Sequence, residues 1–75
     1  MVLGNNLKIK RFNKNQLTQE ELSAEVKVSR QTIHAIEKGK FNPSVKLALL
    51  IAQYFDCQVE DIFEYVQESE EDEQK

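Results

Sequence analysis

Residues 18–37 read TQEELSAEVKVSRQTIHAIE, a run that predicts two short helices joined by a tight turn. Thr18 followed three residues later by Glu21 is a capping-box pattern, which marks the start of the first helix. Leu22 and Val26 lie one helical turn apart and give that helix an apolar face. The turn between the two helices falls on Lys27 and Val28.

The second helix of this run spans residues 29–38 and begins at Ser29, a residue type that favours the N-cap position. Ile33 and Ile36 form its apolar face at helical spacing. Its outer face carries four polar or charged residues: Arg30, Gln31, His34 and Lys38. The forked ends of Arg and Gln can bond two atoms of one base edge, guanine for Arg and adenine for Gln. A short amphipathic helix that presents them from its first turn is typical of a recognition helix in the DNA major groove.

The whole chain has 75 residues, which is enough for one small domain with a modest core. Its single cysteine, Cys57, and single histidine, His34, exclude a disulfide framework and a Cys/His metal cage. With two glycines and no nucleophile near a suitable base, the sequence offers neither a phosphate-binding loop nor a catalytic group. We therefore expect no enzyme activity, no cofactor and no metal.

Charge is unevenly distributed along the chain, whose net charge is −3. Residues 1–66 carry nine Lys and Arg against eight Asp and Glu, whereas residues 67–75 carry five acids and one Lys. We predict that residues 1–66 form the folded domain and that residues 67–75 are a disordered acidic tail. The near-neutral domain does not exclude nucleic acid as a partner, because the placement of basic residues matters more than their sum.

The sequence also bears on the compartment and on small ligands. No basic start followed by a long apolar run occurs at the N-terminus, and no stretch is long and apolar enough to cross a membrane. We therefore expect a cytoplasmic protein without a membrane partner. A chain with no second domain leaves little room for an effector pocket, so we expect no small-molecule ligand.

Three runs of the sequence together resemble the Cro/lambda-repressor-like helix-turn-helix family, in particular its small stand-alone prokaryotic regulators. They are LTQEEL (residues 17–22), VSRQTI (residues 28–33) and IEKGKFNPS (residues 36–44), and the similarity extends from about residue 6 to residue 65. The resemblance implies an all-α, compact five-helix domain with the helix-turn-helix at its second and third helices. It also implies that the two chain ends pair as a small antiparallel β-hairpin.

The remaining elements follow from local patterns and from this resemblance. They are a first helix from Asn5 or Asn6 to Asn13, a fourth helix over residues 44–55, a short fifth helix over residues 59–62 and a strand over residues 63–66. The fourth helix is apolar nearly all round, which places it in the core, at an interface, or both. Lys27 stands where the family has Gly, and a turn with positive φ there would cost on the order of 1 kcal/mol.

The resemblance also implies a set of DNA-contacting residues. Base reading is expected from Arg30, Gln31 and His34, and phosphate binding from Arg11, Thr18, Gln19, Ser29, Thr32, Lys38, Lys40 and Asn42. At the family position of Arg11, an arginine pairs with the glutamate that ends the recognition helix, here Glu37. Two alternatives remain open for His34: a base or phosphate contact, or a polar side chain on a wet helix face.

These features predict a sequence-specific DNA-binding transcriptional regulator, a repressor that binds a near-palindromic operator as a homodimer. Two copies related by a two-fold axis would place their recognition helices in half-sites roughly 34 Å apart. The alternative is an antitoxin or partner-binding module that uses the same fold. Against that alternative stands the polar, fork-ended face of the predicted recognition helix, which a pure interaction module does not need.

Overall fold

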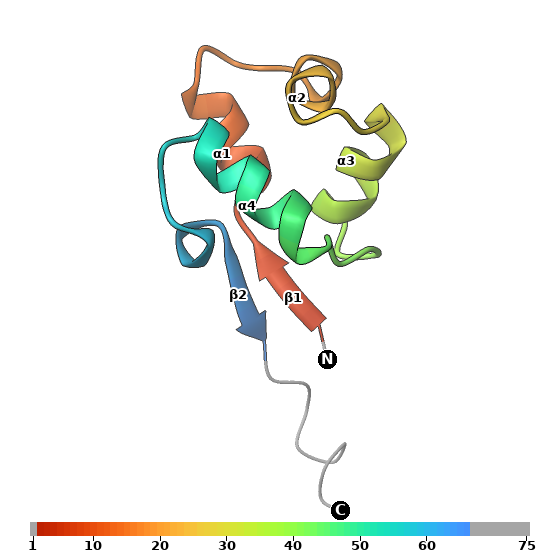
Figure 1. Ribbon diagram of the computed structural model, residues 1–75, viewed down its shortest axis with the longest axis vertical. Coiled ribbons are helices and arrows are strands. Elements are labelled where there is room, and N and C mark those ends of the chain that lie inside the picture. Colours follow the sequence, from red (N-terminus) through yellow and green to blue (C-terminus); the bar gives the residue numbers. More distant parts are fainter. Residues whose placement is uncertain (1, 67–75) are drawn as a thin grey trace, which may run out of the picture.

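The computed structural model describes residues 2–66, and the acidic tail expected at residues 67–75 lies outside the described residues. The described chain folds in the order β1 (Val2–Asn5), α1 (Leu7–Asn13), α2 (Gln19–Val26), α3 (Arg30–Glu37), α4 (Val45–Tyr54), η1 (Val59–Asp61) and β2 (Phe63–Val66), as Figure 1 shows; η1 is a 3₁₀ helix. The α2–turn–α3 unit is the helix-turn-helix expected from residues 18–37.

The caps that the sequence predicts for α2 and α3 are present. The Glu21 N–H donates to Thr18 Oγ1 at 3.0 Å and the Thr18 N–H donates to Glu21 Oε1 at 2.9 Å, so the capping box is closed in both directions. Ser29 Oγ accepts from the Thr32 N–H at 3.2 Å and starts α3. Between the two helices Lys27 has φ +64°, which confirms that this turn needs the left-handed conformation.

α3 ends on a glycine for a conformational reason. Gly39 has φ +76°, a value that glycine adopts without steric cost. Its N–H donates to the Ile36 carbonyl at 3.0 Å and the Lys40 N–H donates to the Ala35 carbonyl at 2.9 Å. This pair of bonds is a Schellman motif, which satisfies carbonyls that the helix end leaves free. The chain then runs to Ser44, whose Oγ accepts from the Leu47 N–H at 3.1 Å and starts α4.

The fifth expected helix is not an α-helix, and the count of α-helices in the described chain is four. η1 is a single 3₁₀ turn in which the Asp61 and Ile62 N–H groups donate to carbonyls three residues back, both at 3.0 Å. The Gln58 N–H donates to Asp61 Oδ2 at 2.9 Å, a bond that caps the start of η1. β2 begins at Phe63, two residues after η1 ends, so this segment is a short 3₁₀ connector between α4 and β2.

The chain ends pair as a two-stranded antiparallel sheet, as expected, so the domain is mostly helical and not purely α. The register pairs Val2 with Val66 and Asn5 with Phe63. The two strands are the first and last described elements, so they are not neighbours in sequence and the sheet is not a hairpin. The Asn6 N–H donates to the Ile62 carbonyl at 3.0 Å and continues the pairing toward α1.

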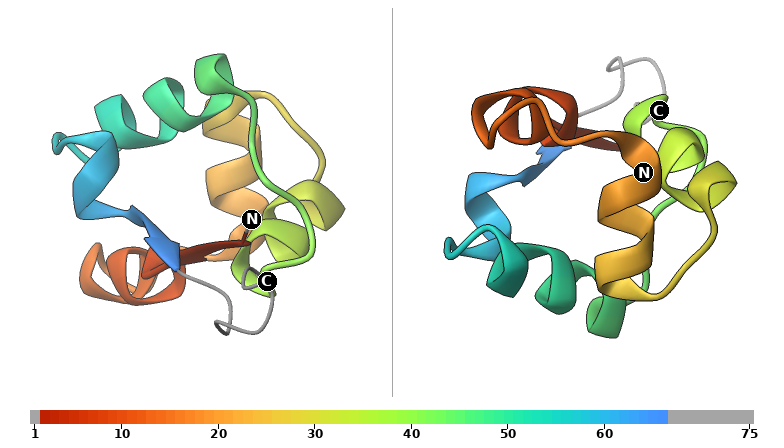
Figure 2. Two further views of the ribbon diagram at one scale, coloured as in Figure 1. Left: turned by 90° about the horizontal axis from the view of Figure 1, so that it is seen from below. Right: turned by 90° about the horizontal axis from the view of Figure 1, so that it is seen from above.

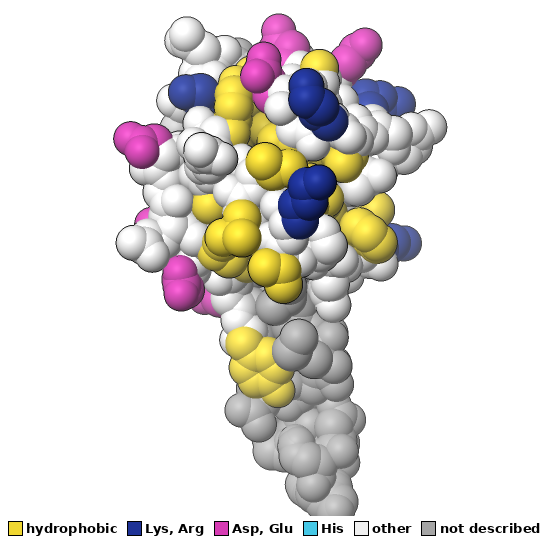
Figure 3. Space-filling model, viewed as in Figure 1, with side chains coloured by type: hydrophobic (Ala, Val, Ile, Leu, Met, Phe, Trp, Pro, Cys, Tyr) yellow, Lys and Arg dark blue, Asp and Glu magenta, His cyan; other side chains and the backbone are white. Residues whose placement is uncertain are grey.

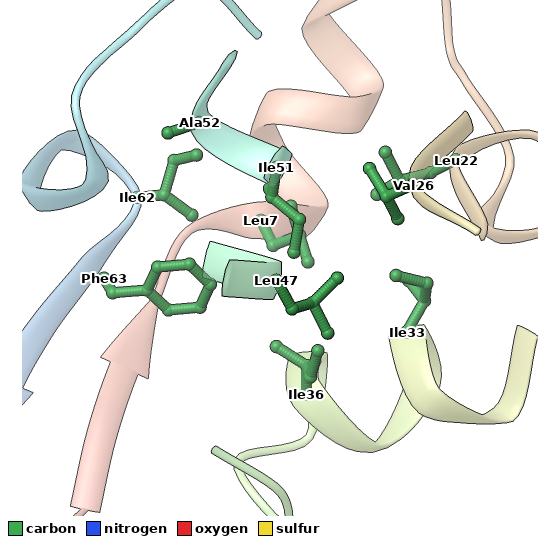
Figure 4. Packing of buried hydrophobic residues seen from close by; sticks show 10 residues of the cluster. All are labelled: Leu7, Leu22, Val26, Ile33, Ile36, Leu47, Ile51, Ala52, Ile62 and Phe63. Atoms are coloured by element: carbon green, nitrogen blue, oxygen red, sulfur yellow. The ribbon is translucent and has the colours of Figure 1, made fainter. Parts of the chain in front are cut away.

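The helices surround one apolar core. Its buried residues come from the four α-helices, from β2 and from Ile62, which lies between η1 and β2; they are Leu7, Leu22, Val26, Ile33, Ile36, Leu47, Ile51, Ala52, Ile62 and Phe63, shown in Figure 4. The two end-on views in Figure 2 show α1 and α4 on opposite sides of this core, with α2 and α3 together on a third side. Of the two aromatic residues expected in β2, Phe63 is in the core and Tyr65 is 61% exposed.

α4 has an apolar face on each side, which agrees with its nearly all-apolar sequence. Leu47 and Ile51 are buried in the core, whereas Val45 is 77% exposed and Leu49 is 56% exposed. Figure 3 shows hydrophobic side chains gathered on the side of the molecule that α4 covers. Val45 and Leu49, one helical turn apart, define what we call the α4 face. Among residues 2–66, none of the helices has the length and apolar composition that crossing a bilayer requires.

Candidate nucleic-acid interface

α3 presents the three expected base-reading residues to solvent. Arg30, Gln31 and His34 are exposed, whereas Ile33 and Ile36 on the other face are 0% and 1% exposed. Figure 4 shows both isoleucines pointing from α3 into the core. The burial of the apolar stripe therefore fixes which face of α3 is available to a partner.

The last residue of α3, Glu37, is held by side chains from α1 and α2. Its carboxylate accepts hydrogen bonds from Arg11 Nε at 2.6 Å, from Arg11 Nη2 at 3.0 Å and from Gln19 Nε2 at 3.0 Å. Arg11 Nη1 donates to the Leu17 carbonyl at 2.7 Å, just before α2. The Arg11 and Glu37 side chains are only 13% and 6% exposed. The pair implied by the resemblance is present, and it ties α3 to α1 and to the segment that leads into α2.

The electrostatics of this cluster favour the charged form of Glu37. Burial raises the pKa of its carboxyl, but the hydrogen bonds from Arg11 and Gln19 and the positive charges of Arg11 and Lys8 lower it more. The net result is a Glu37 pKa below the ordinary value of 4.5. At neutral pH the carboxylate is therefore ionised and fully available to Arg11.

Gln19 links the cluster to the outward face of α3. Its Nε2 is the donor to Glu37 and also lies 3.5 Å from His34 Nδ1. These side chains belong to a shallow depression where α1, α2 and α3 meet, lined by Lys8, Arg11, Gln19, His34, Glu37 and Lys38. The depression brings together four of the predicted site residues, which the sequence places on three different helices.

Two predicted phosphate-binding residues, Thr18 and Ser29, also act as structural caps, and a third, Thr32, contacts the second cap. Thr18 and Ser29 each accept a backbone N–H at the start of a helix. Thr32 Oγ1 lies 3.1 Å from Ser29 Oγ, so one of these two hydroxyls donates to the other. A hydroxyl that accepts a cap bond keeps its own hydrogen, because it is both acceptor and donor. The caps therefore leave a donor at the start of α2 and a donor at the start of α3.

The other predicted phosphate-binding residues lie beyond the end of α3. Lys38 is its C-cap and is exposed, and Lys40 and Asn42 are exposed in the segment that leads to α4. Lys40 and Asn42 do not line the depression. They form a separate polar edge on the chain that follows α3.

Lys8 is a residue of this site that the sequence pattern did not single out. It is exposed on α1 and lines the depression with Arg11, Gln19 and His34. A signal existed, because Lys8 stands three residues before Arg11 and so occupies the same side of α1. Its charge adds to a cationic N-terminal part of the chain: residues 2–18 carry four Lys and Arg and no Asp or Glu.

The described residues offer few alternatives to this interface. Within residues 2–66, no group of three or more His, Cys, Asp or Glu side chains is placed to hold a metal ion. Cys57 is a free, half-buried thiol packed against the core.

The architecture and the exposed face of α3 define a helix-turn-helix domain. A model of the helix-turn-helix family HTH_3 matches residues 8–62, from the second residue of α1 to just past η1. The chain belongs to this family, which is the helix-turn-helix family of Cro/C1 type.

Similar proteins carry names of the same kind. An uncharacterised HTH-type transcriptional regulator of Methanocaldococcus jannaschii is 56% identical over 63 residues, which cover 84% of this chain and 94% of the relative. Another, from Archaeoglobus fulgidus, is 52% identical over 62 residues, or 81% of this chain and 87% of that relative. The crystal structure of the transcriptional regulator VanUg matches with a TM-score of 0.70 and 28% identity, over 89% of this chain and 88% of that one.

Proposed function

We propose that this chain is a sequence-specific DNA-binding transcriptional regulator that inserts α3 into the major groove. The observation that carries the proposal is the outward face of α3, where Arg30, Gln31 and His34 are exposed on a helix fixed at both ends. Arg30 and Gln31 occupy the first turn, from which side chains of a recognition helix reach base edges. In this proposal Arg30 and Gln31 read bases, and His34 contacts a base or a phosphate beside them.

Phosphate contacts on both sides of α3 would set the register of the protein on DNA. On one side are Gln19 and the hydroxyl of Thr18, at a helix start whose first N–H groups have no acceptor within the helix. Beyond the C-terminal end of α3 are Lys38, Lys40 and Asn42, and at its start is the hydroxyl pair of Ser29 and Thr32.

On the α1 side, Arg11 and Lys8 have different proposed roles. Three of the five N–H groups of Arg11 donate hydrogen bonds inside the protein, two to Glu37 and one to the Leu17 carbonyl. Its main role is therefore to position α3, with two remaining N–H groups that can face a phosphate. Lys8 is exposed, and we propose that, of Arg11 and Lys8, it is the residue whose positive charge is freer to face a phosphate.

We further propose that the protein acts as a homodimer through the α4 face. Val45 and Leu49 are exposed by 77% and 56%, on a helix whose other side forms part of the core. Burying apolar side chains of this size against a second copy would contribute roughly 1.5–3 kcal/mol each. Such a dimer would insert one α3 helix into each half-site of a near-palindromic operator, whose half-sites lie roughly 34 Å apart.

The dimer has a matched test. Leu49→Asp puts a charge into the α4 face, and Ile9→Asp puts the same charge on α1, where Ile9 is 60% exposed. Light scattering should show Leu49→Asp as a monomer and both Ile9→Asp and the wild type as dimers. If both variants had the same oligomeric state, the α4 face would not be the dimer interface.

The biological role that follows is repression in the cytoplasm. A small domain that covers a promoter excludes polymerase by occupancy, which requires no catalytic group, cofactor or small ligand. The first experiment is binding to the DNA upstream of the protein's own gene at two salt concentrations, with random DNA as the control. Tighter, salt-dependent binding to the upstream DNA supports the proposal. Failure to bind either DNA at low salt would overturn it and favour the alternative of a partner-binding module.

A further inference from the structure

We propose that Asn5 is a positioning residue for DNA reading, because its carboxamide holds the C-terminal end of α3 against the junction of β1 and α1. Asn5 Nδ2 donates to the Ile36 carbonyl at 2.9 Å, across 31 positions of sequence, and Asn5 Oδ1 accepts from the Leu7 N–H at 3.1 Å. One half-buried side chain thus starts α1 and grips α3. The proposal rests on the proposed function, because it concerns how α3 meets DNA.

The acceptor of this bond lies at the C-terminal end of α3. The Ile36 carbonyl also receives the Gly39 N–H at 3.0 Å as part of the Schellman motif. Asn5 is itself fixed, because its backbone pairs with Phe63 in the terminal sheet. The sheet, α1 and the recognition helix are therefore joined at one residue.

Asn5 and the Glu37 cluster grip α3 at two points. The carboxylate of Glu37 is held by Arg11 and Gln19, whereas the carbonyl of the preceding residue, Ile36, is held by Asn5. Two attachments in different directions restrain the rotation of a helix as well as its translation. α3 has eight residues. A tilt of about 5° about this end would move the other end of a helix roughly 12 Å long by about 1 Å.

A shift of this size matters at the first turn, where Arg30 and Gln31 are placed to read bases. A hydrogen bond keeps its strength over only a few tenths of an ångström. Phosphate contacts from flexible Lys side chains tolerate such a shift more easily. Loss of the Asn5 bond should therefore reduce discrimination between DNA sequences more than it reduces binding to DNA in general.

The neighbouring asparagine provides a matched control. Asn6 Nδ2 donates to the Asp61 carbonyl at 3.0 Å, so it makes the same kind of bond to η1 and not to α3. Asn5→Asp and Asn6→Asp each lose one such donor and gain one negative charge. Asn5→Asp keeps the Oδ1 acceptor for the Leu7 N–H. Asn5→Ser and Asn6→Ser repeat the comparison without a charge change, in case an aspartate variant fails to fold.

The first readout is the ratio of dissociation constants for random DNA and for the best binding site, at one salt concentration. We expect the ratio to fall about threefold to tenfold in the Asn5 variants, the range that one hydrogen bond represents, and to stay within about twofold in the Asn6 variants. Equal ratios for Asn5 and Asn6 variants, with a wild type that discriminates, would overturn the positioning role.

The second readout does not involve DNA. Hydrogen exchange of the Gly39 and Lys40 amides, which donate to carbonyls of α3, should speed up in the Asn5 variants relative to the amides of α2. In the Asn6 variants it should not. Unchanged exchange in the Asn5 variants overturns the inference whatever the DNA result. If the wild type does not discriminate between DNA sequences, the proposed function is overturned. The hydrogen-exchange result then decides by itself whether Asn5 holds the end of α3.

Discussion

The Arg11–Glu37 pair gives the sharpest stability prediction of this structure. Arg11→Met removes a guanidinium that makes three hydrogen bonds, at 2.6 and 3.0 Å to Glu37 and at 2.7 Å to the Leu17 carbonyl. The Glu37 carboxylate, 6% exposed, would keep only the bond from Gln19. The variant therefore leaves a nearly buried charge without its counter-charge, which is the costly way to break an ion pair.

The expected cost is a large part of the stability of the domain. Removing one partner of a fully buried pair costs about 3–5 kcal/mol. Because the Arg11 side chain is 13% exposed at the rim of a depression, water can reach the site, and we expect about 2–4 kcal/mol. A domain of this size has a total free energy of unfolding of about 3–10 kcal/mol.

A double-mutant cycle separates the pair from its surroundings. Glu37→Leu removes the orphaned charge, so Arg11→Met combined with Glu37→Leu should be more stable than Arg11→Met alone. The coupling energy between the two positions should exceed about 1 kcal/mol. Urea unfolding followed by circular dichroism, at one protein concentration because a dimer's stability depends on concentration, measures all four variants. A loss below about 1 kcal/mol for Arg11→Met, or additive losses in the double variant, would show that the Arg11–Glu37 pair does not stabilise the fold.

Three further predictions concern the site. Gln31→Ala should cost about 1–3 kcal/mol at the cognate DNA and relax specificity at one base pair, as binding to a panel of single-base variants would show; equal losses on every sequence would remove it as a reader. Lys38→Ala should weaken binding to all sequences alike and lower the salt slope by about one, and an unchanged slope in a salt titration would exclude its phosphate contact. Because the pKa of Glu37 is lowered by folding, its stabilisation is present above the ordinary value of 4.5 and is lost as the pH falls through the folded-state pKa. Urea unfolding should therefore show Glu37→Gln less stable than wild type at neutral pH, with a difference that shrinks in acid; a difference that grows in acid would contradict the pairing.

The helix-turn-helix could be predicted from the sequence because its signals are local. The Thr18–Glu21 capping box, the Ser29 cap and the apolar pairs of α2 and α3 each depend on residues within one turn of each other. The Arg11–Glu37 pair came from the family resemblance, since nothing in the spacing of the two residues indicates their contact. The loop between α1 and α2 contains two residues in the left-handed conformation, Asn15 and Gln16, at φ +58° and +56°.

The features that the sequence did not reveal depend on how the elements pack. Lys8 joins the depression only because α1 lies beside α2 and α3. The bond from Asn5 to the Ile36 carbonyl requires the terminal sheet to lie next to the end of α3. The fifth helix, which the family resemblance implied, is only a 3₁₀ turn that is followed at once by the strand beginning at Phe63. For Lys8 and for Asn5 the deciding contact is remote in sequence, where periodicity carries no information.

In the proposed function, α3 reads DNA sequence through its outward face. The most direct test is selection of binding sites from a random DNA library, with the wild type and the Arg30→Ala/Gln31→Ala double variant in parallel. We expect the wild type to enrich a near-palindrome with half-sites centred about 10 base pairs apart. The double variant should bind DNA at low salt without enriching those base pairs. No enriched sequence for the wild type, or the same sequence for the double variant, would contradict the claim.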